Sequence, residues 1–296
     1  MDFHLTWDVL AQAIMLGLMN GAFYALLSLG LSITFGILDI VNFAHGAMYM
    51  MGAFVGWMLL TYFGIGFWPA LILAPLAIGL FGILIERTML VRLYGLHHIY
   101  GLLLTFGMAR VIEGLFRIGY SVSGQRYGVP EALRGGLDLG FIYMPLYRLW
   151  VIGASLVICF GIWFAINGTR LGSYLRASIE NAALVRAFGI NVPRLVTLTF
   201  GLGAGLAGLT GVMAAPIFSV SPLMGSNIVV VVFAVVVIGG LGSIMGSIIG
   251  GFTLGIVEAI TQAFYSQASH VGIFIAMAVV LLTKQGGLSG TTARAS

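Results

Sequence analysis

The sequence predicts an all-α protein, a polytopic membrane helical bundle of eight or nine spans with broken or re-entrant helices. Of its 296 residues, 60% are hydrophobic and only 7% are charged, whereas soluble domains average about 25% charged residues. The chain also contains 43 glycines. Glycine is common in transmembrane helices because it lets two backbones approach closely. We therefore treat the whole chain, 1–296, as one transmembrane domain.

The first apolar run is too long for a single span. No charged residue occurs from Val9 to Leu38, and about 20 apolar residues suffice to cross a bilayer. We expect a first helix over 9–29 and a break around Gly30 to Gly36. The later spans are expected near 40–63, 68–87, 99–118, 149–167, 195–216, 226–240, 247–265 and 270–283. The stretch 226–246 either spans fully or is re-entrant.

The glycines suggest two packing features. Three glycines with the same spacing occur twice, each time after a long apolar run. This hints at an internal repeat, a common way to build transporters. With so many glycines, chance is the alternative. The matching sets are Gly46, Gly52 and Gly56 against Gly240, Gly246 and Gly250. A third set predicts one small-residue helix face for close packing: Gly201, Gly205, Gly208 and Gly211.

Charge and polarity predict the topology. The glycine-rich, polar segment 119–148 is expected to be an extracytoplasmic loop. Basic segments near 87–98 and 169–194 are expected in the cytoplasm, because cytoplasmic loops carry an excess of Lys and Arg. Counting alternations between them places the N-terminus outside and the C-terminus in the cytoplasm.

Enzyme motifs are missing from the sequence. The single cysteine, Cys159, excludes a disulfide framework and a cysteine-based metal site. The single lysine, Lys284, does not end a phosphate-binding loop motif. There is also no H-E-x-x-H and no G-x-S-x-G. We therefore expect no catalysis and no cofactor or metal on this chain; if ATP drives it, a separate subunit hydrolyses the ATP.

Four polar residues inside predicted spans are candidates for a translocation path: Asp39, Asn42, His45 and Glu258. The first three lie three apart, which places them on one side of a helix. A charge inside a bilayer is costly and normally faces a cavity or a partner. The structural alternative is that Asp39 caps a helix, that Asn42 satisfies freed backbone groups, and that Glu258 makes an interhelical bond, for example with Arg110. Glu113 and Arg117 are spaced as an ion pair.

The longest polar interruption, Thr169 to Arg194, predicts a short helix with specified ends. Ser178 can cap it, with Glu180 in its first turn. Gly189 suits the left-handed position that ends a helix, and Asn191 can cap the next helix, with Pro193 in its first turn. A compact helix with small residues on one face fits a groove on a partner. The alternative is an ordinary basic loop.

The run from Glu180 to Pro193 resembles the coupling motif of ABC importer permeases. In that motif E-A-A is followed by a glycine and a proline-like end, and this chain departs from it by an inserted Asn181. Three further stretches resemble the shorter of the two permease types of the high-affinity branched-chain amino acid importers: LSITFGILDIVNFAHGAMYMMGAFVG, IERTMLVRLY and VIGGLGSIMGSIIGGFTLGIVEA. The resemblance covers essentially the whole chain.

The resemblance implies a single permease domain in the bacterial cytoplasmic (inner) membrane. Its partners would be a homologous second permease subunit, two cytoplasmic ATPases that bind the ATP, and an extracytoplasmic substrate-binding protein facing 119–148. The cargo would be branched-chain amino acids or related small amino acids and amides. By resemblance, the segment 169–194 couples to the ATPase through these residues: Arg176, Glu180, Ala182, Ala183, Arg186, Gly189 and Pro193.

Two other classes of function are weighed against this one. A self-sufficient secondary transporter or channel would use Asp39, Glu113 or Glu258 for ion coupling. A membrane enzyme is disfavoured by the missing motifs. Transport that follows an ion gradient without any ATPase would single out the secondary transporter.

Overall fold

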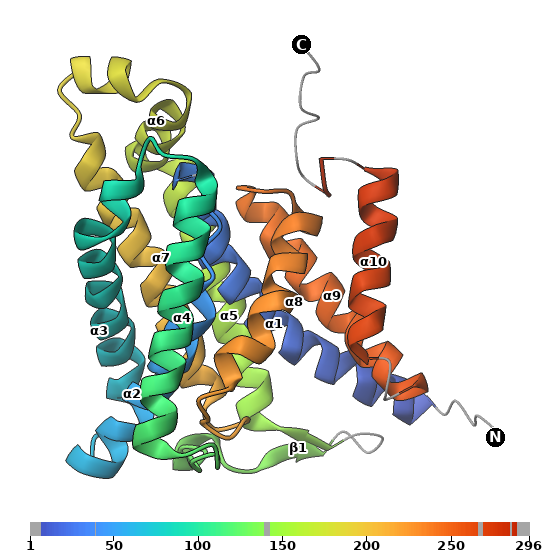
Figure 1. The fold of residues 1–296 in the computed structure, drawn as a ribbon. Helices are drawn as coiled ribbons and strands as arrows, with labels where there is room; N and C mark the ends of the chain where they lie inside the picture. Colours follow the sequence, from blue (N-terminus) through green and yellow to red (C-terminus); the bar gives the residue numbers. More distant parts are fainter. Residues whose placement is uncertain (1–6, 39, 139–142, 266–268, 285, 289–296) are drawn as a thin grey trace. The chain divides into compact units, whose positions relative to one another are not determined.

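A computed structural model describes residues 7–38, 40–138, 143–265, 269–284 and 286–288. The helices in this part of the chain are α1 (Trp7–Leu38), α2 (Ala44–Phe63), α3 (Phe67–Thr88), α4 (His98–Tyr120), α5 (Leu146–Gly168), α6 (Arg170–Ala187), α7 (Val192–Ala214), α8 (Met224–Gly239), α9 (Ile244–Phe264) and α10 (Ser269–Thr283) (Figure 1). The same part of the chain also contains two short 3-10 helices, η1 (Leu90–Leu93) and η2 (Glu131–Leu133), and two short strands, β1 (Gly136–Asp138) and β2 (Tyr143–Pro145).

Seven of these helices are long and apolar enough to cross a membrane, and two further apolar helices, Met224–Gly239 and Val271–Thr283, are shorter. The predicted all-α bundle is confirmed. The predicted 119–148 loop is slightly shorter than expected. It begins later, because α4 runs to Tyr120, and it ends earlier, because α5 starts at Leu146. The antiparallel pairing of β1 with β2 inside that loop was not predicted.

The predicted break at Gly30 to Gly36 is wrong. The helix α1 continues to Leu38, so it has 32 residues and is about 48 Å long. Gly30 is a packing position instead: a Cβ atom there would lie 2.9 Å from the carbonyl oxygen of Gly203. The chain leaves the helix only after Leu38 and forms α2 from Ala44.

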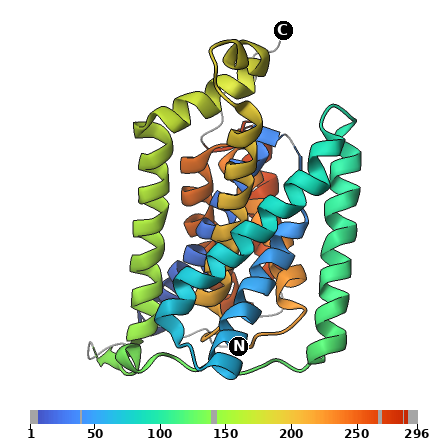
Figure 2. The same ribbon diagram turned by 90° about the vertical axis from the view of Figure 1, so that its left-hand side faces the viewer.

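Contacts divide the chain into two compact units, and each is described by itself. Unit 2 comprises 29–128 and 161–230. Its centre is α7, which packs on α3 and α2 through glycines. A Cβ on Gly205 would lie 3.1 Å from the Pro75 carbonyl oxygen, and one on Gly211 would lie 2.1 Å from that of Tyr49. The predicted small-residue face of α7 is confirmed, and Figure 2 shows α3 crossing α7.

Unit 1 comprises 1–28, 129–160 and 231–296, and it is held together by the same kind of contact. The first half of α1 packs on α9: a Cβ on Gly255 would lie 2.4 Å from the carbonyl oxygen of Gly17. A Cβ on Gly251 would lie 2.5 Å from the Ala25 nitrogen. Larger side chains at these positions would separate the two helices.

The first members of the two matching glycine sets occupy different kinds of position. Gly46 lies inside the first turn of α2, against the Gly225 carbonyl oxygen. Gly240 lies in the turn between α8 and α9, where its φ of 101° favours glycine. The second members, Gly52 and Gly246, are both close-packed positions inside a helix. The internal repeat stays a prediction.

A glycine at a helix crossing should tolerate alanine far less well than a glycine facing open space. A Cβ on Gly52 would lie 2.3 Å from the Gly208 carbonyl oxygen, whereas nothing lies within 4 Å of a Cβ on Gly107. We expect Gly52→Ala to destabilise the protein by about 1–3 kcal/mol, because backbone must move. Gly107→Ala should be neutral or stabilising, because alanine favours helix. Thermal unfolding of the detergent-solubilised variants measures both; equal melting temperatures would contradict the crossing.

Candidate functional site

The segment after α5 forms two helical arms joined at a kink. Asn181 has non-helical backbone angles (φ −152°, ψ 89°) inside α6. Its side-chain Oδ1 accepts a hydrogen bond from the Leu184 N–H at 2.9 Å, so Asn181 is the N-cap of the second arm. The predicted cap at Ser178 is wrong, because the Ser178 hydroxyl donates one turn back, to the Tyr174 carbonyl oxygen at 2.6 Å.

The end of the second arm is as predicted. Gly189 adopts φ 81°, and its N–H donates to the Arg186 carbonyl oxygen at 2.9 Å. Asn191 then caps α7 by accepting from the Arg194 N–H at 3.0 Å, and Pro193 lies in the first turn of that helix. Gly189 and Asn191 thus form a short, specified joint between the second arm and α7.

The predicted coupling residues do not all lie on an open surface. Glu180, Ala183 and Arg186 are exposed, and Ala182 is half-buried. The Arg176 guanidinium donates to the Ile166 carbonyl oxygen at 3.2 Å and to the Asn167 side chain at 3.3 Å. Arg176 therefore binds the last turn of α5, where a cation satisfies unpaired carbonyl groups.

Two exposed apolar side chains on the second arm were missed. Leu184 is 55% exposed and Phe188 is 76% exposed. They are four residues apart and follow a polar stretch, so they lie on neighbouring turns of one face. Apolar surface on an otherwise polar segment marks an interaction site. This spacing in the sequence could have identified them, but the small residues of the motif drew the prediction to the alanines.

The chain between α1 and α2 is held by side chains that satisfy its backbone. The Asn42 Oδ1 accepts from the Ala44 N–H at 3.0 Å. The Thr105 hydroxyl of α4 accepts from the Phe43 N–H at 3.2 Å and lies 3.2 Å from the Val41 carbonyl oxygen. Thr105 is fully buried, and nothing in its sequence context predicted this role.

The path candidates near this break do not share one helix face. Asn42 precedes α2, whereas His45 lies in its first turn, and both are buried. Asp39 lies outside the described residues. The alternative role of Asn42, satisfying freed backbone groups, is confirmed by its hydrogen bond to the Ala44 N–H.

Glu258 makes an interhelical hydrogen bond, with Tyr24 as the donor. The Tyr24 hydroxyl lies 2.6 Å from the buried Glu258 Oε2. Arg110, suggested from the sequence as its partner, donates to Glu113 at 3.0 Å. The predicted Glu113–Arg117 pair is confirmed at 2.5 Å. Among the described residues, no three His, Cys, Asp or Glu side chains gather as metal ligands would.

Comparison with known proteins identifies the family. Residues 13–283 match the family described as "Branched-chain amino acid transport system / permease component". The chain belongs to this family. The permease is 29% identical over 94% of its length to the high-affinity branched-chain amino acid transport system permease protein BraD of Pseudomonas aeruginosa, of which 95% is covered. It is 28% identical to LivH of Escherichia coli K12, with 93% of each chain covered.

The lengths of the matched relatives also show that the permease is of the shorter of the two permease types. The high-affinity branched-chain amino acid transport system permease protein LivM of Escherichia coli K12 is 27% identical, but only 66% of it is covered. BraD and LivH are instead matched over nearly their full lengths. No solved structure is significantly similar to the chain.

A buried carboxylate ties the permease's α7 to α3 close to the joint. Glu86 is 2% exposed and accepts from the Tyr94 hydroxyl and from the Thr197 hydroxyl, each at 2.7 Å. Burial, and then the hydrogen bond and charge of Glu86, raise the pKa of the Tyr94 phenol. Tyr94 therefore remains a donor, and α3, the loop after η1 and α7 are linked through one side chain.

We expect Thr105→Val to destabilise the permease by about 1–3 kcal/mol, because it removes the buried hydroxyl that accepts from the Phe43 N–H, at nearly unchanged volume. Thr105→Ser keeps the hydroxyl and is the matched control, expected to lie much closer to the native protein. Thermal unfolding of the purified variants measures the difference. Equal stability of the valine and serine variants would show that Thr105 does not support the break.

Proposed function

We propose that this permease is the membrane subunit of an ATP-driven importer that takes up branched-chain amino acids or related small amino acids and amides. The observation that carries the proposal is membership of the family over residues 13–283. The names of BraD and LivH describe high-affinity branched-chain amino acid transport. Nothing in the chain's motifs supplies ATP hydrolysis, so the energy comes from another subunit.

The assembly that fits this role contains a second, homologous permease, two cytoplasmic ATPases and an extracytoplasmic binding protein. A LivM-type chain is a natural model for the second permease, because LivM is itself similar to this chain. The membrane is the bacterial cytoplasmic membrane. The N-terminus lies outside, and the segment 169–194, with four arginines, lies in the cytoplasm.

The ATPase docks on the second arm of α6 in this proposal. The arm has a cap at Asn181, a stop at Gly189 and an exposed apolar pair, Leu184 and Phe188. Ala183 and Arg186 are exposed on the same arm, and Glu180 is exposed just before its cap. An apolar anchor with a polar rim is the usual composition of a docking surface.

We expect Phe188→Ala to weaken binding of the ATPase subunit by roughly tenfold or more, because buried aromatic anchors carry much of an interface's energy. Leu80→Ala, at a 65% exposed position on α3, removes similar apolar surface away from α6 and is the control. Titration of the ATPase onto the solubilised permease pair measures both affinities. Unchanged affinity of the Phe188 variant would place the docking surface elsewhere.

Uptake by proteoliposomes that contain the complete assembly tests the function. We expect L-leucine uptake to require the binding protein outside and ATP on the ATPase side. Uptake by the permease alone, driven by a proton or sodium gradient, would instead support the secondary-transporter alternative. Omitting ATP and, separately, adding an ionophore distinguish the two energy sources.

A further inference from the structure

A small cavity lies between α4, the start of α2 and the start of α8, all within unit 2. Its volume is about 40 Å³. One charged wall comes from α4, and the opposite wall is mostly apolar. The residues that define it are Phe106, Arg110 and Glu113 of α4, Met50 of α2, and Ser226 and Val229 of α8. Neither the family nor the names of the relatives assigns a role to it.

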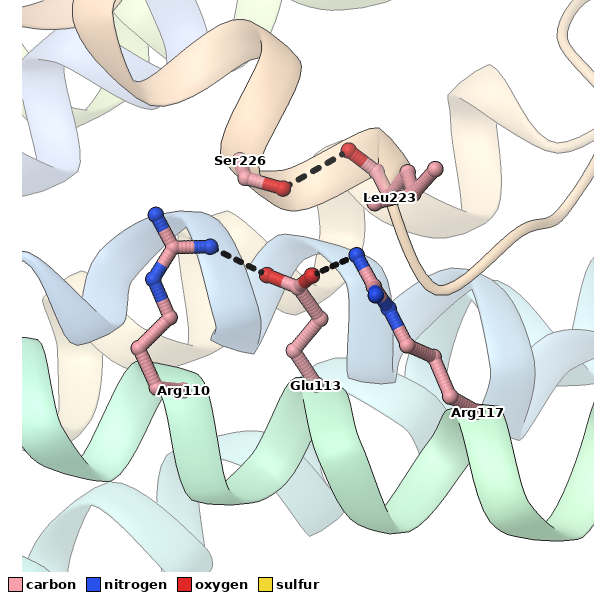
Figure 3. A network of polar contacts seen from close by, with 5 residues as sticks. All are labelled: Arg110, Glu113, Arg117, Leu223 and Ser226. Carbon is pink, nitrogen blue, oxygen red and sulfur yellow. Dashed lines mark hydrogen bonds and ion pairs between the residues drawn. The ribbon is translucent and has the colours of Figure 1, made fainter. Parts of the chain in front are cut away.

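The charged wall, Arg110 and Glu113, belongs to a row of three side chains on consecutive turns of α4. The Glu113 carboxylate, whose side chain is 9% exposed, lies between two guanidinium groups. One of its oxygens is 3.0 Å from the Arg110 Nη1, and the other is 2.5 Å from the Arg117 Nη2. Figure 3 shows Glu113 pointing between the two arginines, with Ser226 and Leu223 on the facing segment. Two cations share one anion, so the row carries one positive charge in excess.

Arg110 contacts two side chains of its own helix, and among the described residues few of its donors are assigned a partner. Its guanidinium carbon lies 5.2 Å from the centre of the Phe106 ring, the distance of a cation–π contact. Of its five N–H donors, the structure assigns one to Glu113. Of the two arginines, Arg110 lines the cavity and Arg117 does not.

The position of Arg110 argues against contact with lipid. It lies midway along α4, a helix apolar and long enough to span a membrane, yet 55% of its side chain is exposed. An arginine at that depth normally faces a water-filled path or a partner. The first turn of α8, which is the positive end of that helix dipole, lines the same cavity through Gly225 and Ser226.

We propose that this cavity receives the α-carboxylate of the transported amino acid, with Arg110 as the residue that binds it. This proposal rests on the proposed import of amino acids. A guanidinium binds a carboxylate through two parallel hydrogen bonds, and the excess positive charge of the row is neutralised when the anionic group enters. Glu113 and Arg117 position the Arg110 fork, and Arg117 lies outside the cavity lining.

The size of the cavity limits the proposal to the carboxylate end. A volume of about 40 Å³ holds a few water-sized groups, so it fits a carboxylate but not a whole leucine. The aliphatic part of the substrate then lies toward the apolar wall of Met50 and Val229. The whole substrate enters only when α4 and the start of α8 separate.

Arg110→Gln and Arg117→Gln provide a matched test, because each breaks one ion pair with Glu113 but only Arg110 lines the cavity. We expect L-leucine uptake by the reconstituted assembly to fall by roughly tenfold or more in Arg110→Gln. Binding-protein-stimulated ATP hydrolysis and co-purification of the second permease should be retained. L-leucine uptake should fall much less in Arg117→Gln. Arg110→Lys, which keeps the charge but not the fork, should fall between them.

Three outcomes would overturn the proposal. Native uptake by Arg110→Gln would remove the need for the guanidinium. Equal losses in Arg110→Gln and Arg117→Gln would mean that the row is only a structural ion pair. Loss of the second permease from Arg110→Gln preparations would make this face an assembly surface.

A binding measurement separates this proposal from the proposed function. Thermal shifts of the assembly without binding protein compare L-leucine with L-leucinol, which has a hydroxymethyl group in place of the carboxylate. We expect L-leucine to stabilise the native protein, L-leucinol to stabilise it far less, and Arg110→Gln to remove the difference. An equal response to both ligands would overturn the carboxylate site. Absence of ATP-dependent uptake in the native assembly would overturn the function instead.

Discussion

In this permease, the backbone groups left unpaired where the chain leaves or enters a helix take hydrogen-bond partners from the protein, a need that is strictest in apolar surroundings, where lipid provides none. Side chains supply them at three places. Asn42 and Thr105 satisfy the segment between α1 and α2, Asn181 satisfies the start of the second arm of α6, and Asn191 satisfies the start of α7. Short polar side chains therefore satisfy the helix starts at these places, whereas glycines such as Gly189 end helices.

Glycines have a different task in both units. They allow helix backbones to touch, as Gly52 does with Gly208 in unit 2 and Gly255 does with Gly17 in unit 1. Packing of this kind is the main source of helix association where the surrounding lipid is as apolar as the side chains. Between these glycine contacts, the interior also holds a few large buried side chains, such as Tyr49 and Phe200.

The sequence was informative where one physical cause acts alone. Apolar length predicted the spanning helices, and the left-handed preference of glycine predicted the stop at Gly189. It failed where one residue type has two uses: Gly30 suggested a break but is a packing position. Asn181 read as an interruption of a motif but is the cap that starts the arm. Thr105 could not be foreseen, because its partners at Val41 and Phe43 are distant in sequence.

The Glu86 cluster has a mechanical consequence for the joint at Gly189 and Asn191. Since the Thr197 and Tyr94 hydroxyls both donate to Glu86, the base of α7 is linked to the end of α3 less than two helical turns beyond the joint. A force applied at the exposed Leu184 and Phe188 surface is therefore expected to reach α3 as well as α7, because the Glu86 carboxylate links the two helices just beyond the joint.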